Sequence, residues 1–167
     1  LLSGKDSAMD ILDAGCGVGF TTHELGKFYS NSKVVGVDIS SDGIMYAKDN
    51  FRSEDFLCQG IDPKNPPLGR FDLIFCFEFY PFTRTNSVEV HREYLGYFLS
   101  QLKETGELIL HQRWENPDSI SSNMSVLKNQ FGLYRFNTYR VPHAKLIKLF
   151  KFAVLSKFMD KFFRFLL

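Results

Sequence analysis

The feature that most constrains this chain is a glycine-rich turn directly after a short apolar run. Residues 11–19 read ILDAGCGVG, so Gly15, Gly17 and Gly19 occupy alternate positions. Glycine lets a backbone turn tightly and lie close to a ligand, because no side chain blocks the approach. A helix is expected over residues 21–29, and the free amides and positive dipole end at its start would face the same ligand. The sequence therefore predicts a strand, a ligand-binding turn and a helix in succession.

The rest of the chain alternates strand-like and helix-like segments. We expect strands at 9–13, 33–38, 56–59, 71–77, 107–112 and 133–141, and helices at 21–29, 42–50, 88–103 and 119–130. Prolines and a glycine mark residues 62–70 as loop. Strands separated by helices require parallel crossovers, so the predicted fold class is α/β: Rossmann-like and doubly wound, with a mostly parallel sheet and helices on both faces.

Two carboxylates beside the turn indicate the kind of ligand. Asp38 ends the second strand, where a carboxylate in a doubly wound fold accepts hydrogen bonds from ribose hydroxyls. Asp13 precedes the turn, where it would repel a pyrophosphate but attract an amino group or a sulfonium. Gly19 follows Gly17 by two residues, whereas a dinucleotide fingerprint places its third glycine three residues after the second. These features favour a cationic nucleoside over a dinucleotide.

These motifs resemble those of class I S-adenosylmethionine-dependent methyltransferases. ILDAGCGVG at 11–19 is similar to the first motif of that family, VGVDIS at 35–40 to the second, and FDLIFCFE at 71–78 to the fourth. The resemblance extends over roughly residues 9–112. It implies S-adenosylmethionine as the cofactor, S-adenosylhomocysteine as the product, and no metal.

The resemblance also implies which residues hold the cofactor. The methionine part would be surrounded by Asp13 and the turn residues Gly15, Cys16, Gly17 and Gly19. Asp38 would bind the ribose, and Ile39 would lie against the adenine. Asp62, or the backbone at Ile61, would meet the adenine amino group, but Asp62 precedes Pro63 and equally fits a turn. Phe77, at the end of the fourth strand, completes the predicted cofactor site.

Substrate residues are expected where the strands 71–77 and 107–112 end, because an open parallel sheet exposes its crevice there. The catalytic residues are unknown, with Glu78, His111 and Arg113 as candidates and Trp114 beside them. Residues 78–81 read EFYP, which is not the Asn/Asp-Pro-Pro-aromatic tetrad of the amide- and adenine-methylating branches. We therefore predict methyl transfer to a small-molecule acceptor. The alternative is a cofactor-binding domain of the same fold that has lost transfer.

Composition narrows the partners further. The net charge is only +1, so a nucleic-acid partner is not expected. The three cysteines have no metal-ligand spacing, and a reducing cytoplasm is the expected location. Residues 1–141 are predicted to form the cofactor-binding core, and residues 142–167 a basic, Phe-rich helical segment packed on the same domain.

The segment 142–167 combines six basic residues with six Phe and only one acidic residue. Three interpretations stay open: a packed helical insertion, which we favour, a lid over the acceptor pocket, or an anchor on an anionic membrane surface. The anchor would imply a lipid-linked acceptor. Class I domains usually finish with a pair of antiparallel strands, and the second of these is expected to be truncated here, because only residues 163–167 could begin it.

Overall fold

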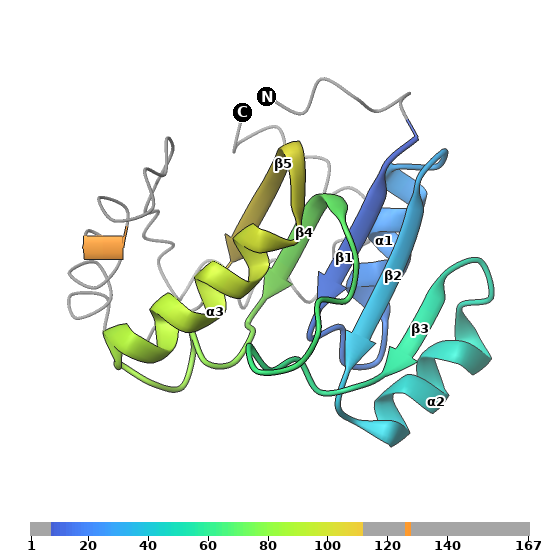
Figure 1. The fold of residues 1–167 in the computed structure, drawn as a ribbon. Helices are drawn as coiled ribbons and strands as arrows, with labels where there is room; N and C mark the ends of the chain where they lie inside the picture. Colours follow the sequence, from blue (N-terminus) through green and yellow to red (C-terminus); the bar gives the residue numbers. More distant parts are fainter. Residues whose placement is uncertain (1–7, 112–125, 128–167) are drawn as a thin grey trace, which may run out of the picture.

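The computed structural model describes residues 8–111 and 126–127, and all that follows concerns those residues. Figure 1 shows the elements in the order β1 (Asp10–Ala14), α1 (Phe20–Phe28), β2 (Lys33–Asp38), α2 (Ser41–Asn50), β3 (Asp55–Cys58), β4 (Phe71–Phe77), α3 (Val88–Ser100) and β5 (Leu102–His111). Each of these elements was expected from the sequence, with boundaries that shift by a few residues.

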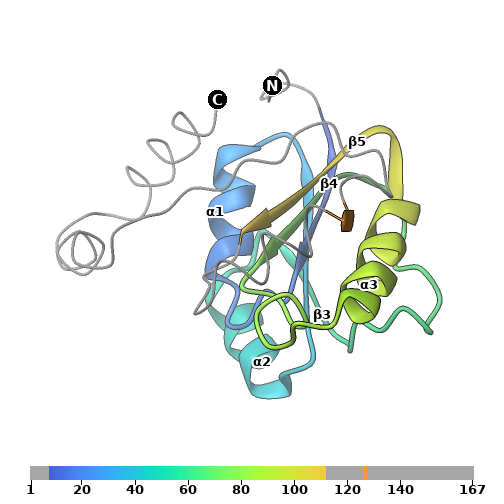
Figure 2. The ribbon, with the colours of Figure 1, turned by 90° about the vertical axis from the view of Figure 1, so that its left-hand side faces the viewer.

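The five strands form one parallel sheet in the order β3-β2-β1-β4-β5. From β1 the chain proceeds through β2 to β3 at one edge of the sheet, and it then returns to β4, which lies on the other side of β1. The strand order therefore reverses between β1 and β4. In Figure 2, α1 lies on one face of the sheet and α3 on the opposite face. The predicted Rossmann-like fold with helices on both faces is confirmed. In such a fold, ligands bind at the carboxyl ends of the strands beside this switch point.

Apolar residues on both faces of β1 and β4 explain why these strands occupy the centre of the sheet. Successive residues of a strand point to opposite faces. Leu73 and Phe75 join Ile11 in the core under α1, whereas Ile74 joins Leu12 in the core under α3. Burying each such side chain stabilises the fold by about 1.5–3 kcal/mol. Leu127, which is helical and lies within the predicted helix 119–130, is buried in the core under α3.

The three helices begin differently. The Ser40 hydroxyl accepts a hydrogen bond from the Gly43 amide and so caps the start of α2, and Ser87 caps α3 through the Val90 amide. No side chain caps α1, which begins after Gly19 with that residue in a left-handed conformation. The first amides of α1 are therefore left open to other acceptors near the turn.

The boundary between α3 and β5 differs from the sequence prediction. The sequence predicts a helix over residues 88–103, but α3 ends at Ser100. The backbone carbonyl of Gln101 already accepts the Phe71 amide of β4 at 2.8 Å, so the chain has joined the sheet. β5 then pairs irregularly with β4 between Phe71 and Leu73. A Cβ on Gly106 would lie 2.8 Å from the Phe71 carbonyl oxygen, so Gly106 permits this close approach.

Several predictions fall outside the described residues. These are the strand 133–141, the truncated second strand of the final pair, and the packing of the basic segment 142–167, together with most of the helix 119–130. The division of the chain at residue 141 therefore stays a prediction. Among the helices of the described part, none is long and apolar enough to span a membrane.

Candidate cofactor site

The glycine turn connects β1 to α1 and is tied to the neighbouring strand. The Gly15 and Cys16 amides both donate to the carbonyl of Val37 in β2, at 2.8 and 3.1 Å. Gly15, Gly17 and Gly19 all have positive φ, at 78°, 55° and 85°. L-residues with side chains rarely adopt this left-handed conformation, which explains the alternating glycines. The turn is thus fixed against the carboxyl end of β2.

Asp38 ends β2 and binds the backbone on two sides. Its Oδ2 accepts the Gly17 amide and its Oδ1 accepts the Ser40 amide, each at 2.8 Å. The carboxylate therefore joins the glycine turn to the loop after β2. An ionised carboxylate offers about four acceptor positions, so both oxygens can still accept hydrogen bonds from a ligand. The sequence predicted a ligand contact for Asp38 but not this structural role.

The three glycines have different neighbours. A Cβ on Gly15 would lie 2.7 Å from the ring of Phe79, and one on Gly19 would lie 2.7 Å from the Cβ of Ala47 and 2.8 Å from Phe56. Packing inside the protein therefore requires glycine at both positions. No described atom lies within 4 Å of a Cβ built on Gly17. Of the three, only Gly17 presents its backbone to open space.

Asp13 lies under the turn and is fully buried. The Thr22 hydroxyl donates to its Oδ2 at 2.7 Å, and no described group donates to its buried Oδ1. Burial raises the pKa of Asp13 to about 7, and the charge of Asp38 adds to the rise while the Thr22 hydrogen bond opposes it. A buried carboxyl group with one open oxygen would gain from a cationic neighbour. Asp13 is thus poised to change its charge when its surroundings change.

Burial also affects the two cysteines near the turn, Cys16 and Cys76, and makes their thiols unreactive. Burial raises the pKa of the Cys16 thiol to about 12 and that of Cys76 well above its usual value, and the charge of Asp13 contributes to both. The thiolate is the nucleophilic form of cysteine. Cys16 takes part in the turn through its backbone amide, which donates to Val37.

The predicted adenine contacts follow β2 and β3. Ile39 is 79% exposed directly after Asp38. Ile61 is partly buried, and its carbonyl accepts the Tyr94 hydroxyl at 3.3 Å. Asp62 is exposed, and its Oδ1 accepts the Lys64 amide while its carbonyl accepts the Asn65 amide. These bonds are those of a residue that starts a turn, so the structural role anticipated for Asp62 is present.

The predicted acceptor residues follow β4 and β5. The Phe77 ring lies parallel to the His111 ring, with centroids 4.5 Å apart and an interplanar angle of 4°. The Glu78 amide donates to the His111 carbonyl at 2.8 Å, which brings the two strand ends together. Glu78 is exposed and has a φ of 53°, a conformation that costs a non-glycine residue about 1–3 kcal/mol and is concentrated at functional sites. Arg113 and Trp114 lie outside the described residues.

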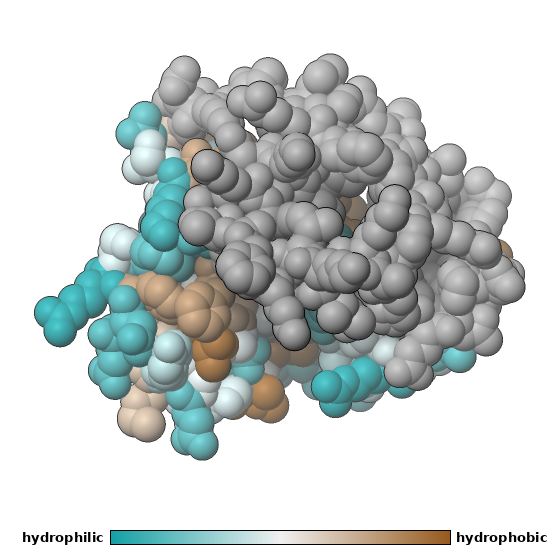
Figure 3. Space-filling view, turned by 180° about the vertical axis from the view of Figure 1, so that it is seen from behind, coloured by the Kyte–Doolittle hydropathy of each residue, from teal (hydrophilic) through white to brown (hydrophobic). Residues whose placement is uncertain are grey.

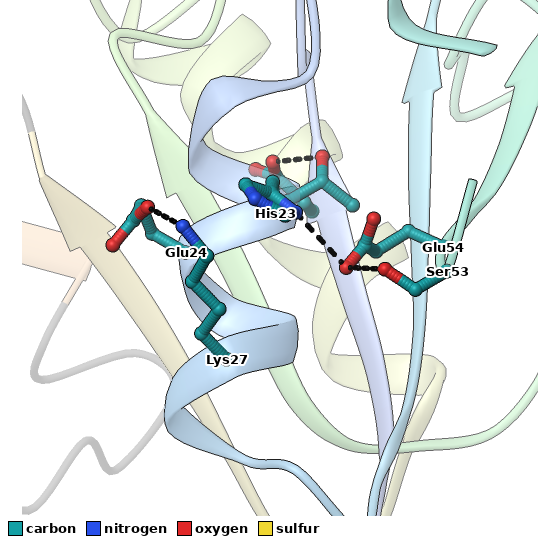
Figure 4. Close-up of polar contacts among 7 residues, drawn as sticks. His23, Glu24, Lys27, Ser53 and Glu54 are labelled. Atoms are coloured by element: carbon teal, nitrogen blue, oxygen red, sulfur yellow. Dashed lines mark hydrogen bonds and ion pairs between the residues drawn. The ribbon is translucent and has the colours of Figure 1, made fainter. Parts of the chain in front are cut away.

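A second polar cluster lies on α1, away from the turn. Figure 4 shows His23 pointing from α1 toward Glu54, with His23 Nδ1 3.2 Å from Glu54 Oε1 and the Ser53 hydroxyl donating to the same oxygen at 2.7 Å. The residue types resemble a hydrolytic triad, but serine and histidine both contact the carboxylate instead of each other. The hydroxyl therefore has no base within the cluster. The contact between His23 and Glu54 joins α1 to the segment before β3. Among residues 8–111 and 126–127, no group of three or more His, Cys, Asp or Glu side chains could hold a metal ion.

The outer face of α1 and α2 carries exposed apolar side chains. The Phe20 ring lies 6.3 Å from that of Tyr46 and 5.4 Å from that of Phe51. In Figure 3, which shows the molecule from behind, apolar side chains gather at lower left among hydrophilic ones. Phe20 begins α1 directly after Gly19, so it is adjacent in sequence to the glycine turn.

The fold and the turn define a Rossmann-like α/β domain whose glycine turn lies at the switch point of the sheet. A family model described as a methyltransferase domain matches residues 5–153, so the chain belongs to the methyltransferase domain family. The chain is 27% identical over 157 residues to the protein named "Putative methyltransferase 235L" of Invertebrate iridescent virus 6, covering 80% of this chain and 59% of the viral protein. The chain thus spans less than two thirds of this relative.

Two examples illustrate the similarity of this chain to solved structures. The plantazolicin methyltransferase BpumL, solved with a monoazolic desmethyl analogue and S-adenosylhomocysteine, is 25% identical, with a TM-score of 0.54, covering 74% of this chain and 46% of BpumL. A TehB-like S-adenosylmethionine-dependent methyltransferase from Corynebacterium glutamicum is 22% identical, with a TM-score of 0.50, covering 72% of this chain and 65% of that protein. The second likeness concerns the fold alone.

Proposed function

We propose that this chain binds S-adenosylmethionine at the glycine turn and transfers its methyl group to a small-molecule acceptor. The observation that carries the proposal is Gly17. Its backbone is left-handed, its amide is held by Asp38, and the space where a side chain would stand is open. The left-handed backbone already favours glycine here, and the open space beside it leaves room for a ligand to lie directly on the backbone.

The residues around Gly17 fit the parts of this cofactor. Asp38 retains acceptor positions for two ribose hydroxyls, in addition to its bonds to the Gly17 and Ser40 amides. Ile39, which is largely exposed beside Asp38, offers an apolar surface on which an adenine ring can lie. Membership in the methyltransferase domain family and the S-adenosylhomocysteine bound in BpumL support the same assignment.

Asp13 supplies the electrostatic part of the proposal. A positively charged group near its open Oδ1 would favour the ionised carboxylate and lower its pKa from about 7. S-adenosylmethionine carries two such groups, the ammonium and the sulfonium, whereas a pyrophosphate would oppose ionisation. The site therefore favours a cationic nucleoside over a dinucleotide.

The acceptor would lie where β4 and β5 end. When bound, the cofactor supplies a methyl group on a sulfonium, which a nucleophile can take up without a dedicated base if it is well aligned. Phe77 and Tyr80 expose aromatic rings there, and the carboxylate of Glu78 lies between them in sequence. Exposed rings with a few polar groups are typical of sites for small organic ligands. The azole-containing ligand of BpumL is a compound of this kind.

Isotope transfer tests the proposal. The purified chain is incubated with a cell extract that contains metabolites, protein and nucleic acid, together with S-adenosylmethionine that carries a deuterated methyl group, and each fraction is analysed by mass spectrometry. The proposal expects one or a few metabolites to gain the label, and a Gly17→Val variant to give none, because a branched side chain would fill the open space. Label confined to protein or nucleic acid would refute the small-molecule acceptor. Equal labelling by the Gly17→Val variant would refute the assigned cofactor site.

A further inference from the structure

One face of α3 holds the loop that follows β3. The Tyr94 hydroxyl donates to the Ile61 carbonyl at 3.3 Å, and the Tyr97 hydroxyl donates to the Pro66 carbonyl at 3.1 Å. One turn further on, the Gln101 side chain accepts the Leu68 amide at 2.7 Å. These three side chains follow each other at helical spacing and therefore share a face of the helix end. They bind the loop at successive points along its length.

Tyr94 differs from the other two because its ring also reaches the loop after β4. Its centroid lies 6.0 Å from that of Phe79 and 6.2 Å from that of Tyr80, and the Tyr80 ring meets it edge-on at 86°. Phe79 in turn packs against the backbone of Gly15, since a Cβ there would lie 2.7 Å from its ring. Tyr94 therefore contacts the loops after β3 and β4 directly, and it reaches the glycine turn through Phe79.

We propose that Tyr94 is a positioning residue that holds the adenine-side loop at Ile61 and the acceptor-side loop at Phe79 and Tyr80 in one fixed arrangement. This inference rests on the proposed function, because it assigns the two loops to cofactor and acceptor. The hydroxyl fixes the first loop and the ring fixes the second. A single side chain would thus set the separation between the bound nucleoside and the acceptor pocket.

The surroundings of Tyr94 keep its hydroxyl a donor. Burial raises its pKa, and the negative charges of Asp62 and Glu93 and the neighbouring Tyr80 add to the rise. The phenol consequently stays protonated at neutral pH. Aromatic pairs at these distances and tilts stabilise packing beyond the area they bury, so the ring contributes separately from the hydroxyl.

Two conservative variants separate these roles. Tyr94→Phe removes the bond to Ile61 but keeps the ring, and the matched control Tyr97→Phe removes the bond to Pro66 from the same helix. A hydrogen bond of this kind corresponds to a change of about three- to tenfold in an equilibrium constant. We expect Tyr94→Phe to raise the Kd of S-adenosylhomocysteine, measured by calorimetry, by about that factor, and Tyr97→Phe to leave it within about twofold, although both lose similar stability. Equal Kd values for wild type and Tyr94→Phe would overturn the inference.

Hydrogen exchange of the ligand-free protein provides a second measurement. Tyr94→Leu should speed amide exchange in both loops, at residues 60–62 and 78–82, whereas Tyr97→Leu should affect only the loop that follows β3. Unchanged exchange at 78–82 in Tyr94→Leu would refute the coupling of the loops. If wild type bound no S-adenosylhomocysteine, the proposed function would fail, and hydrogen exchange would still decide whether Tyr94 joins the two loops.

Discussion

Replacing Asp13 with Asn should change how the stability of this protein depends on pH. The buried carboxyl group has a pKa of about 7 in the folded protein, against 3.8 for an ordinary Asp. Between these values the folded state binds one proton more than the unfolded state. The free energy of unfolding therefore falls as the pH rises through this window, and the stabilisation is complete below about pH 4 and lost above about pH 7.

The two pKa values fix the size of the effect. Integrated from about pH 5 to about pH 8, they predict that the Asp13 carboxyl lowers the free energy of unfolding by about 2–3 kcal/mol. Asn keeps an oxygen for the Thr22 hydroxyl but does not ionise. Burying the Asn side chain carries a free-energy cost that does not depend on pH. The informative quantity is therefore the change in the free energy of unfolding with pH, and a stability measured at one pH is not informative.

Urea unfolding of wild type and Asp13→Asn at several pH values measures this slope. We expect the difference between the two proteins to move in favour of the variant by about 2–3 kcal/mol over this range. His91 is present in both proteins and cancels in the comparison. Burial lowers the pKa of His91, so its contribution has the opposite sign and is lost as the pH falls below the ordinary value. Parallel curves for the two proteins would refute the assignment of a raised pKa to Asp13.

Four further variants test the site and the sheet. Gly17→Ala should weaken S-adenosylhomocysteine binding more than tenfold in calorimetry, and it should cost about 1–2 kcal/mol of stability because the backbone is left-handed. Gly19→Ala should lower the stability measured in urea by more than Gly17→Ala, because its Cβ would meet Ala47. A larger loss of stability in Gly17→Ala would contradict the packing. Asp38→Ala should weaken binding by about ten- to a hundredfold, and unchanged affinity would leave only its structural role. The salt bridge to Lys103 helps to lower the pKa of Asp72, so the stability that it provides is lost as the pH falls below the pKa of an ordinary Asp. Lys103→Met should remove this acid-labile stability. An unchanged dependence of stability on acidic pH would contradict the assignment.

Local patterns were sufficient to predict most of the fold. The alternation of apolar strands with helices determined the parallel sheet, because each crossover must pack against a face that is already apolar. The glycine turn was also visible locally, since its strand, its glycines and its helix are adjacent in sequence. The boundary of α3 was not, because it depends on the Gln101 carbonyl meeting the Phe71 amide, a contact between segments about thirty residues apart.

Contacts between distant segments also limited how much of the site could be predicted from the sequence. The sequence predicted all three glycines as ligand contacts, but it did not indicate that Gly15 and Gly19 also pack against Phe79 and Phe56, which come from distant elements. The bonds from Asp38 to the Gly17 and Ser40 amides likewise appear only when β1 and β2 are side by side. Tyr94 carried no signal in the sequence beyond its apolar helix position. Its importance follows from the loops that the fold brings to it.

The central claim is that the turn at Gly17 binds a cationic nucleoside, and calorimetric titration of the purified chain tests it most directly. S-adenosylmethionine and S-adenosylhomocysteine should each bind at one site with measurable heat, and NAD should not. For S-adenosylmethionine near pH 7, the heat should also depend on the ionisation enthalpy of the buffer, because Asp13 releases a proton as the cation binds. A folded sample that gives no heat with either nucleoside, or that prefers NAD, would contradict the account.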